Sequence, residues 1–284
     1  MIGNKKEIHA GDDSTNIQAQ NVTIQHNGLS YTDVKEVAMD VFKSNFYNLG
    51  QTVEKIINER AEEIINEYLK RLISKNPEAL QKTEDADLRF IIYEAQKNHA
   101  RRGDKEIAHL LVDMLIERTE TKEETLVKIV YNEALEILPK LTLKQINILT
   151  VIFILLYVKL DNAFYIEQLN LAIKKFAKVI PEEEFFYQHL QYAGCVSISI
   201  GEVNFVNLLK TYYPNLVPVS HENEDLLFKK NLKNVAPHLH MILGQMKKTS
   251  IPNCSLTSVG IAIALSNFKR NIETDWDLGI WIKE

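Results

Sequence analysis

The stretch Ile146-Asn-Ile-Leu-Thr-Val-Ile-Phe-Ile-Leu-Leu-Tyr-Val158 is the most apolar run of the chain. Only Asn147 interrupts it, and Lys159 follows it. The run is too short to cross a bilayer, because a membrane-spanning helix takes about 20 residues. We therefore expect a buried helix at the centre of the C-terminal half. The preceding stretch Thr142-Leu-Lys-Gln145 has the spacing of a capping box, which predicts where this helix starts.

Helical spacing of apolar residues also dominates the N-terminal half. An apolar stripe runs from Val34 to Leu72 at spacings of three and four, and Thr32 is a plausible N-cap before it. This pattern predicts one long first helix of about 60 Å, unless Gly50 divides it. Asn76-Pro77 closes the stripe and begins the next element, with proline at its tolerated first position.

Further boundary signals predict additional helices. Arg101-Arg-Gly-Asp104 reads as a cationic last turn, a C′ glycine and a new N-cap. Thr121-Lys-Glu-Glu124 has the spacing of a second capping box. Thr257 is expected to cap a helix that runs to about Arg270. The sequence thus predicts a mainly α fold.

Two later stretches alternate with period two and are expected to be strands: Cys195 to Ile200, and Trp276 to Ile282. The first belongs to Phe185–Ile200, where a helix, a glycine and a strand follow one another as in winged-helix proteins. Leu256-Thr-Ser-Val-Gly260 then resembles the capped helix that often follows a wing. We divide the chain into an N-terminal β segment (1–28), a helical domain (29–140) and a possible winged-helix-like domain (141–284).

Composition narrows the classes of function. The chain has 284 residues and a net charge of −5, so it has no general attraction to nucleic acid or to anionic membranes. Two cysteines, Cys195 and Cys254, are too few for a disulfide framework, although one bridge between them stays open. The polar N-terminus lacks the apolar core of a secretory signal. We expect a cytoplasmic protein with no membrane association.

No group of residues carries a catalytic or metal-binding signature. His238-Leu-His240 has no companion at zinc spacing. His189 and Cys195 lie near each other in sequence, but nothing signals the base and oxyanion hole that a thiol nucleophile needs. Glu182-Glu-Glu184 is explained by a helix start. We assign no catalytic, cofactor-binding or metal-binding residue, and a hydrolase or nuclease with an unrecognised site remains an alternative.

Nucleic acid is an unlikely partner on this sequence. The helix that would read DNA carries Glu182, Glu183 and Glu184 and has no Arg or Lys after Lys178, whereas base and phosphate contacts rely heavily on both. The best basic cluster is Lys229, Lys230 and Lys233, which solvated lysines on a helix face also explain. A winged-helix-like DNA-binding regulator using these lysines is the second alternative.

The N-terminal segment gives the sharpest signal. Between Ser14 and Gln25 there is neither a charged residue nor a proline, and amide side chains alternate with apolar ones. Segments of this composition can stack with copies of themselves. The residues expected to do so are Ile17, Gln18, Gln20, Asn21, Val22 and Ile24. The helical body of the same chain is the other surface on which the segment can pack, and disorder is the third possibility.

Several motifs are similar to those of an uncharacterised family of bacterial cytosolic proteins. They are Gly11–Ile24, Gly28–Phe46, Tyr187–Ser199, Leu256–Gly260 and Asp277–Ile282. The resemblance implies membership without an activity. The opening stretch also looks like short strand motifs at the termini of some bacterial defence and signalling proteins, where they mediate self-association.

Our hypothesis from the sequence is a non-enzymatic, homo-oligomeric interaction or scaffold protein. The N-terminal β segment and the long first helix would assemble its subunits, and the C-terminal half would present a surface to another protein. The second resemblance suggests a role in bacterial defence or stress response. No cofactor is expected.

Overall fold

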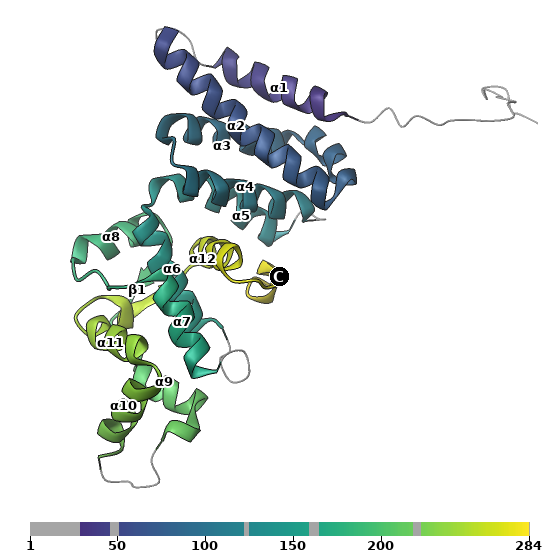
Figure 1. Ribbon diagram of the computed structural model, residues 1–284. Helices are drawn as coiled ribbons and strands as arrows, with labels where there is room; N and C mark the ends of the chain where they lie inside the picture. Colours follow the sequence, from purple (N-terminus) through teal and green to yellow (C-terminus); the bar gives the residue numbers. More distant parts are fainter. Residues whose placement is uncertain (1–28, 46–50, 122–124, 159–164, 218–222, 284) are drawn as a thin grey trace, which may run out of the picture.

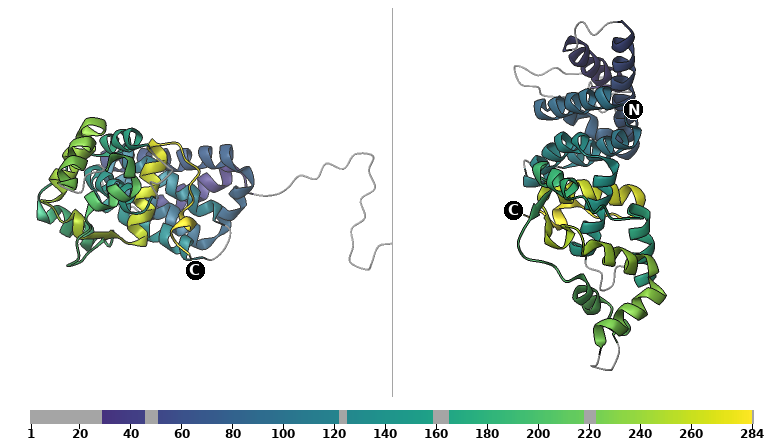
Figure 2. Two further views of the ribbon diagram at one scale, coloured as in Figure 1. Left: turned by 90° about the horizontal axis from the view of Figure 1, so that it is seen from below. Right: turned by 90° about the vertical axis from the view of Figure 1, so that its left-hand side faces the viewer.

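The computed structural model describes residues 29–45, 51–121, 125–158, 165–217 and 223–283. Within these residues the protein is mainly α-helical, as the sequence predicts, with one two-stranded sheet. The helices stack into an elongated body, with α1 (Tyr31–Ser44) at one end and α10 (Glu224–Val235) at the other (Figure 1, Figure 2). None of the helices in the described ranges combines the length and apolarity needed to cross a membrane.

The N-terminal half is built from antiparallel helices. After α1 come α2 (Gln51–Lys75), η1 (Pro77–Glu84), α3 (Ala86–Arg102), α4 (Lys105–Glu120), α5 (Leu126–Ile137) and η2 (Leu138–Lys140). Asn76-Pro77 marks the boundary that the sequence predicts, since Pro77 begins η1. Gly103 closes α3 in the left-handed conformation and Asp104 caps α4, again as predicted.

Of the two possibilities left open for the first apolar stripe, the divided one is observed, and a single unbroken helix is not. Helix α1 ends at Ser44 and α2 begins at Gln51. The two helices run antiparallel: Lys35 pairs with Glu62 at 2.7 Å, and the Tyr31 hydroxyl donates to Asn66 at 2.6 Å. The continuous apolar stripe is therefore two stripes that face each other.

Two predicted caps are wrong. The N-cap of α1 is Ser30 instead of Thr32, because Ser30 and Asp33 form a reciprocal capping box. Helix α5 begins after Thr125, so Thr121 does not cap it; Thr121 is the residue that ends α4. In both cases a second hydroxyl residue lies a few positions away, and the packing of the apolar stripe selects between the two.

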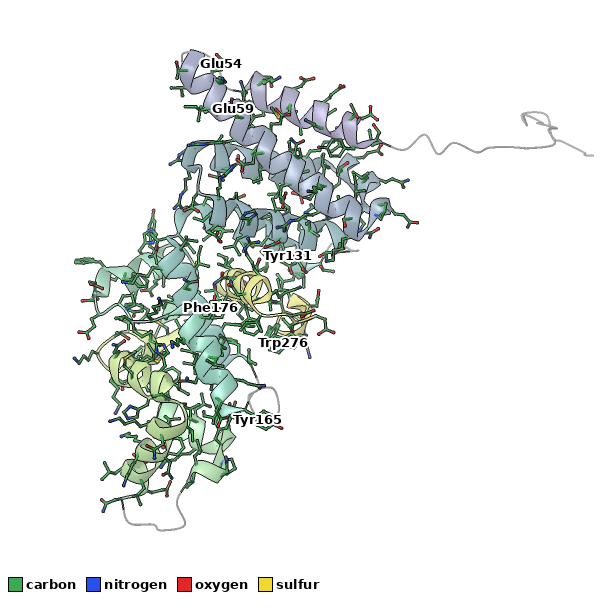
Figure 3. All side chains as sticks on the ribbon, in the orientation of Figure 1. Glu54, Glu59, Tyr131, Tyr165, Phe176 and Trp276 are labelled. Carbon is green, nitrogen blue, oxygen red and sulfur yellow. The ribbon has the colours of Figure 1, made fainter. Side chains whose placement is uncertain are left out.

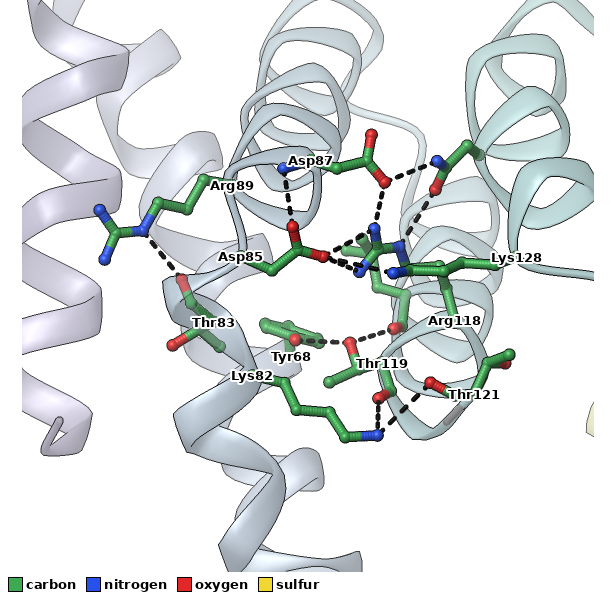
Figure 4. A network of polar contacts seen from close by, with 12 residues as sticks. Tyr68, Lys82, Thr83, Asp85, Asp87, Arg89, Arg118, Thr119, Thr121 and Lys128 are labelled. Atoms are coloured by element: carbon green, nitrogen blue, oxygen red, sulfur yellow. Dashed lines mark hydrogen bonds and ion pairs between the residues drawn. The ribbon is translucent and has the colours of Figure 1, made fainter. Parts of the chain in front are cut away.

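Buried polar groups tie α2, α3, α4 and α5 together (Figure 4). The guanidinium of Arg118 is buried and donates to Asp85 at 3.2 Å, to Asp87, and to Asn132 at 3.1 Å. Asp85 also caps α3 by accepting from the Asp87 backbone N–H. A buried charge is tolerated where it is paired and hydrogen-bonded, so this cluster fixes the start of α3 against α4.

The C-terminal half surrounds a buried central helix. Its elements are α6 (Leu143–Leu156), α7 (Ile166–Phe176), α8 (Glu184–Tyr192), β1 (Val196–Ile198), α9 (Phe205–Tyr212), η3 (Pro214–Leu216), α10, α11 (Pro237–Met246), η4 (Ile251–Asn253), β2 (Cys254–Leu256), α12 (Ser258–Asn271) and η5 (Leu278–Ile280). Ten of the 14 residues of α6 are buried, which confirms the buried helix, and the predicted capping box of Thr142 and Gln145 is present.

Helix α12 packs along α6 and is itself buried over most of its length. Its cap is Thr257, as predicted. Inside the contact, the Asn267 amide donates to Thr150 at 2.8 Å and to Asn147 at 3.0 Å. The one polar residue that interrupts the apolar run, Asn147, thus takes part in the packing.

The predicted strand at Cys195–Ile200 is confirmed as the shorter β1. It pairs antiparallel with β2, which the sequence analysis missed, in the register Val196↔Leu256. The predicted final strand, Trp276–Ile282, is wrong. The Asp277 carboxylate accepts from the Gly279 N–H and starts the 3₁₀ turn η5, while the Trp281 indole donates to the Tyr157 carbonyl at 2.7 Å.

Where the winged-helix hypothesis expects a wing after β1, the chain has a helical excursion from residue 199 to residue 253. Its described part contains α9, α10 and α11 (Figure 1). We use "helical excursion" for this segment below.

Gly260 is expected to be intolerant of a side chain. A Cβ atom at this position would lie 2.0 Å from the Cys195 carbonyl oxygen, which also accepts from the Thr257 N–H. Gly260→Ala should lower the free energy of unfolding by about 1–3 kcal/mol, the range for overpacking. Urea unfolding measures it.

Gly244 provides the matched control for this substitution, because it lies within α11 and a Cβ there meets no atom within 4 Å. Gly244→Ala should be stabilising by about 0.5–1 kcal/mol, the difference in helix propensity. Equal effects of the two substitutions would show that the contact between α12 and β1 is not tight.

Candidate interaction surface

The residues predicted to self-associate, Ile17, Gln18, Gln20, Asn21, Val22 and Ile24, lie outside the described residues. The structure does describe the surface next to the point where they join the folded body. Leu29 is the first described residue, and Ser30 caps α1 immediately after it.

A shallow apolar groove runs between α1 and α3 from this point, and we call it the α1/α3 groove. Its walls are formed by Leu29, Asp33, Val34, Val37, Ala38, Val41, Thr83, Arg89, Ile92, Tyr93 and Gln96. Val37 and Val41 lie one helical turn apart on α1 and remain 38% and 41% exposed. Helix α1 lies at one end of the stack (Figure 1), and α3 forms the other wall of the groove.

The wall of the α1/α3 groove contains a buried polar atom with no partner in the described residues, the side-chain oxygen of Gln96. The Gln96 amide nitrogen donates to the Ala61 carbonyl at 3.2 Å, which fixes the side chain against α2. A buried acceptor without a donor is unfavourable by about 1–3 kcal/mol.

A second exposed apolar surface lies on α8, and we call it the α8 aromatic face. Phe185 and Tyr192 are 82% and 90% exposed, and their spacing of seven puts them on the same side of the helix. The opposite side packs inward through Tyr187 and Leu190, both fully buried. Large aromatic side chains that face solvent in this way are typical of surfaces that contact another protein.

The alternative nucleic-acid residues are placed on α10. Lys230 and Lys233 are exposed, and Lys229 is half-buried. The pKa of His240 on α11 is lowered by burial and by the charges of Lys233 and Lys229. The three lysines thus lie on α10, within the helical excursion, and not on α8.

The residues considered for chemistry are held in ordinary structural roles. Burial raises the pKa of the Cys195 thiol to about 12 and that of Cys254 to about 11. Both thiols are free, and their positions differ by three residues along the paired strands, about 10 Å at the usual rise, beyond disulfide reach. The His189 ring lies 3.0 Å from the Gln145 amide, not beside Cys195.

His238, near the start of α11, is held by the main chain of another segment. Its ring nitrogen forms a hydrogen bond with the Ala177 carbonyl oxygen at 2.7 Å. Within the described ranges no three or more His, Cys, Asp or Glu side chains are grouped so that they could hold a metal ion.

Comparison with known proteins gives a family and no activity. Neither the curated proteins nor the solved structures include a match to the chain. A family model does match, over residues 28–227 and 220–282, so it covers the folded body and leaves out residues 1–27. Since this match extends over most of the sequence, the chain belongs to that family, whose function is unknown.

Proposed function

We propose that the protein is a homo-oligomeric interaction protein whose copies assemble through residues 1–28. The observation that carries the proposal is the junction between a neutral, strand-like segment and an exposed apolar groove. Residues 14–25 contain no charge and no proline, the two devices that normally keep a strand edge from pairing with copies of itself. Four residues later the chain enters the wall of the α1/α3 groove at Leu29.

The α1/α3 groove supports assembly in a specific way. Val37 and Val41 add exposed apolar surface beside the assembled segments. The charged residues Lys5, Lys6, Glu7, Asp12 and Asp13 precede the neutral stretch. At that position they keep an assembled structure in solution without placing charges within the stack.

Deletion of residues 1–28 is expected to lower the mass of the particle in solution. The helical body keeps its own core, so the helical signal in circular dichroism should change little. Light scattering at tens of micromolar measures the mass. Val22→Lys and Ile24→Lys should act in the same direction, because like charges would face each other in each stacked pair.

The matched control is Leu226→Lys on α10, which places the same charge on an exposed apolar residue far from α1. It should leave the mass unchanged, whereas Val41→Lys in the α1/α3 groove should lower it. A full-length protein that is already a monomer under these conditions would contradict the proposal.

The C-terminal half is proposed to contact a second protein through the α8 aromatic face. Phe185 and Tyr192 support this, as does the absence of Arg and Lys from α8, which disfavours the alternative in which this helix reads DNA. A role in bacterial defence or stress response is our expectation from the resemblance of the opening stretch to self-associating strand motifs.

A further inference from the structure

A polar cavity of about 360 Å³ lies between α2 and α12, with α4 and α5 completing its walls. It is separate from the α1/α3 groove and from the α8 aromatic face, and the proposed function makes no use of it. Its volume lies in the range of sites that take small organic molecules. Tyr131 reaches its wall from α5, on the side of α12 (Figure 3).

Four cationic side chains line the cavity, and each of them pairs with a carboxylate. Arg71 on α2 and Arg270 on α12 share the two oxygens of Asp113. Lys75 pairs with Glu120, and Lys269 pairs with Glu117. Glu67 and Glu120 pair with Arg71 and Lys75 from outside the wall. They are partly exposed, and exposed pairs are weak, so an incoming anion can compete with them.

The two arginines are suited to one type of group. A guanidinium presents five donors in a planar fork that matches phosphate or carboxylate oxygens in a bidentate way. Asp113 holds both forks in place across the cavity, and it uses one terminal nitrogen of each. The second terminal nitrogen of each arginine has no hydrogen bond to the residues that the structure describes, and so remains available to a ligand.

The lining of the cavity also combines apolar contacts with hydrogen-bonding groups. Ile116, Ala262 and Leu265 provide the apolar surface. Burial, and then the carboxylates of Glu117 and Asp277, hold the pKa of Tyr131 well above its usual range, so its hydroxyl stays protonated. Glu117 accepts from Lys269 at 2.7 Å and keeps lone pairs for a ligand hydroxyl or amine.

The cavity wall also contains a buried hydroxyl that nothing pairs. Ser266 is only 7% exposed, and its oxygen has no hydrogen-bond partner among the described residues. A buried hydroxyl without a partner is unfavourable unless water or a ligand satisfies it. Ser266 lines the same cavity as Arg270, one helical turn before it on α12.

We infer that this cavity binds a small organic phosphate that carries a hydroxyl or amino group. The phosphate contacts the terminal nitrogens of Arg71 and Arg270 that Asp113 leaves free, Ser266 donates to it or to an adjoining oxygen, and Glu117 with Tyr131 receives the polar group. Because α2 belongs to the N-terminal half and α12 to the C-terminal half, a bound molecule joins the two halves.

Isothermal titration of the full chain with AMP, inorganic phosphate and adenosine tests this inference. AMP and phosphate should bind saturably, with AMP tighter because it also reaches the apolar wall, and adenosine should bind far more weakly. Absence of saturable binding by both AMP and phosphate at millimolar concentration would overturn the inference.

Substitutions of residues that line the cavity test whether AMP binds there. Arg270→Gln should raise the Kd for AMP by about tenfold or more, as expected for loss of a charged hydrogen bond. Lys230→Gln on α10 removes one positive charge at a distance and should leave the Kd unchanged. Ser266→Ala should weaken AMP binding while the unliganded protein becomes no less stable, a combination that a purely structural role of Ser266 would not produce. Equal affinity of parent, Arg270→Gln and Ser266→Ala would mean that AMP binds elsewhere.

Discussion

Replacement of Ile152 by Lys is expected to prevent the protein from folding. Ile152 is fully buried in α6, a helix that packs against α12 and α7. A buried unpaired charge reduces the free energy of unfolding by more than about 4 kcal/mol, close to the whole stability of many domains. The variant should be recovered mainly in the insoluble fraction.

Leu143→Lys is the matched control, because Leu143 lies at the start of the same helix and is 37% exposed. It should be soluble, with a melting temperature near that of the parent. A parent-like melt of Ile152→Lys would place α6 at the periphery of the fold and contradict the architecture described above.

The second large effect is expected at the buried guanidinium of Arg118. The double change Asp85→Asn and Asp87→Asn retains the shape of both side chains and a good N-cap for α3, but it leaves Arg118 buried without a counter-charge. Breaking a buried ion pair in this way is unfavourable by about 3–5 kcal/mol. Since both carboxylates are more than a third exposed, we expect about 3 kcal/mol, the lower end of that range.

The stability that the double change removes should depend on pH, being larger at neutral than at acidic pH. Burial acts to raise the pKa of Asp85, but hydrogen bonds from the Asp87 N–H and from Arg118 outweigh it and lower that pKa below 3.8. The contribution of Asp85 is therefore complete above pH 3.8 and disappears as the pH falls through its folded-state pKa. Urea unfolding at neutral and acidic pH should show parent and variant converging in acid.

A triple variant separates charge from packing. With Arg118→Met added to the two Asp→Asn changes, the buried charge is gone and most of the lost stability should return. If the triple variant is less stable than the double variant, the Arg118 cluster acts mainly through shape and hydrogen bonds.

Most of the fold could be predicted from the sequence because apolar periodicity and capping residues are local signals. The buried helix at Ile146–Val158, the caps Thr142, Asp104 and Thr257, and the glycine end of α3 all follow from a few neighbouring residues. The break beside Gly50 was left open, since a helical stripe does not reveal whether the chain continues straight or folds back on itself.

The candidate sites could be predicted only in part. The N-terminal segment stands out by composition alone. The α1/α3 groove and the cavity between α2 and α12 combine residues far apart in the chain, such as Arg71 and Arg270. No pattern of neighbouring residues predicts the groove or the cavity. Strand β2 could not be predicted either, because it is recognisable only through its pairing with β1. In Trp276–Ile282 the alternation of apolar and polar residues reflects packing on α6 and α12 instead of strand pairing.

The helical excursion between β1 and β2 has a consequence for how the chain folds. Val196 and Leu256 face each other, although the whole of α9, α10 and α11 lies between them. Closing a loop of this length costs chain entropy equivalent to about 3.5 kcal/mol. We expect the three residue pairs of this sheet to stabilise the closed loop by less than that. We therefore expect the two strands not to nucleate folding. They should pair as a late step, after α11 has packed on α7 and brought Asn253 beside Ser199.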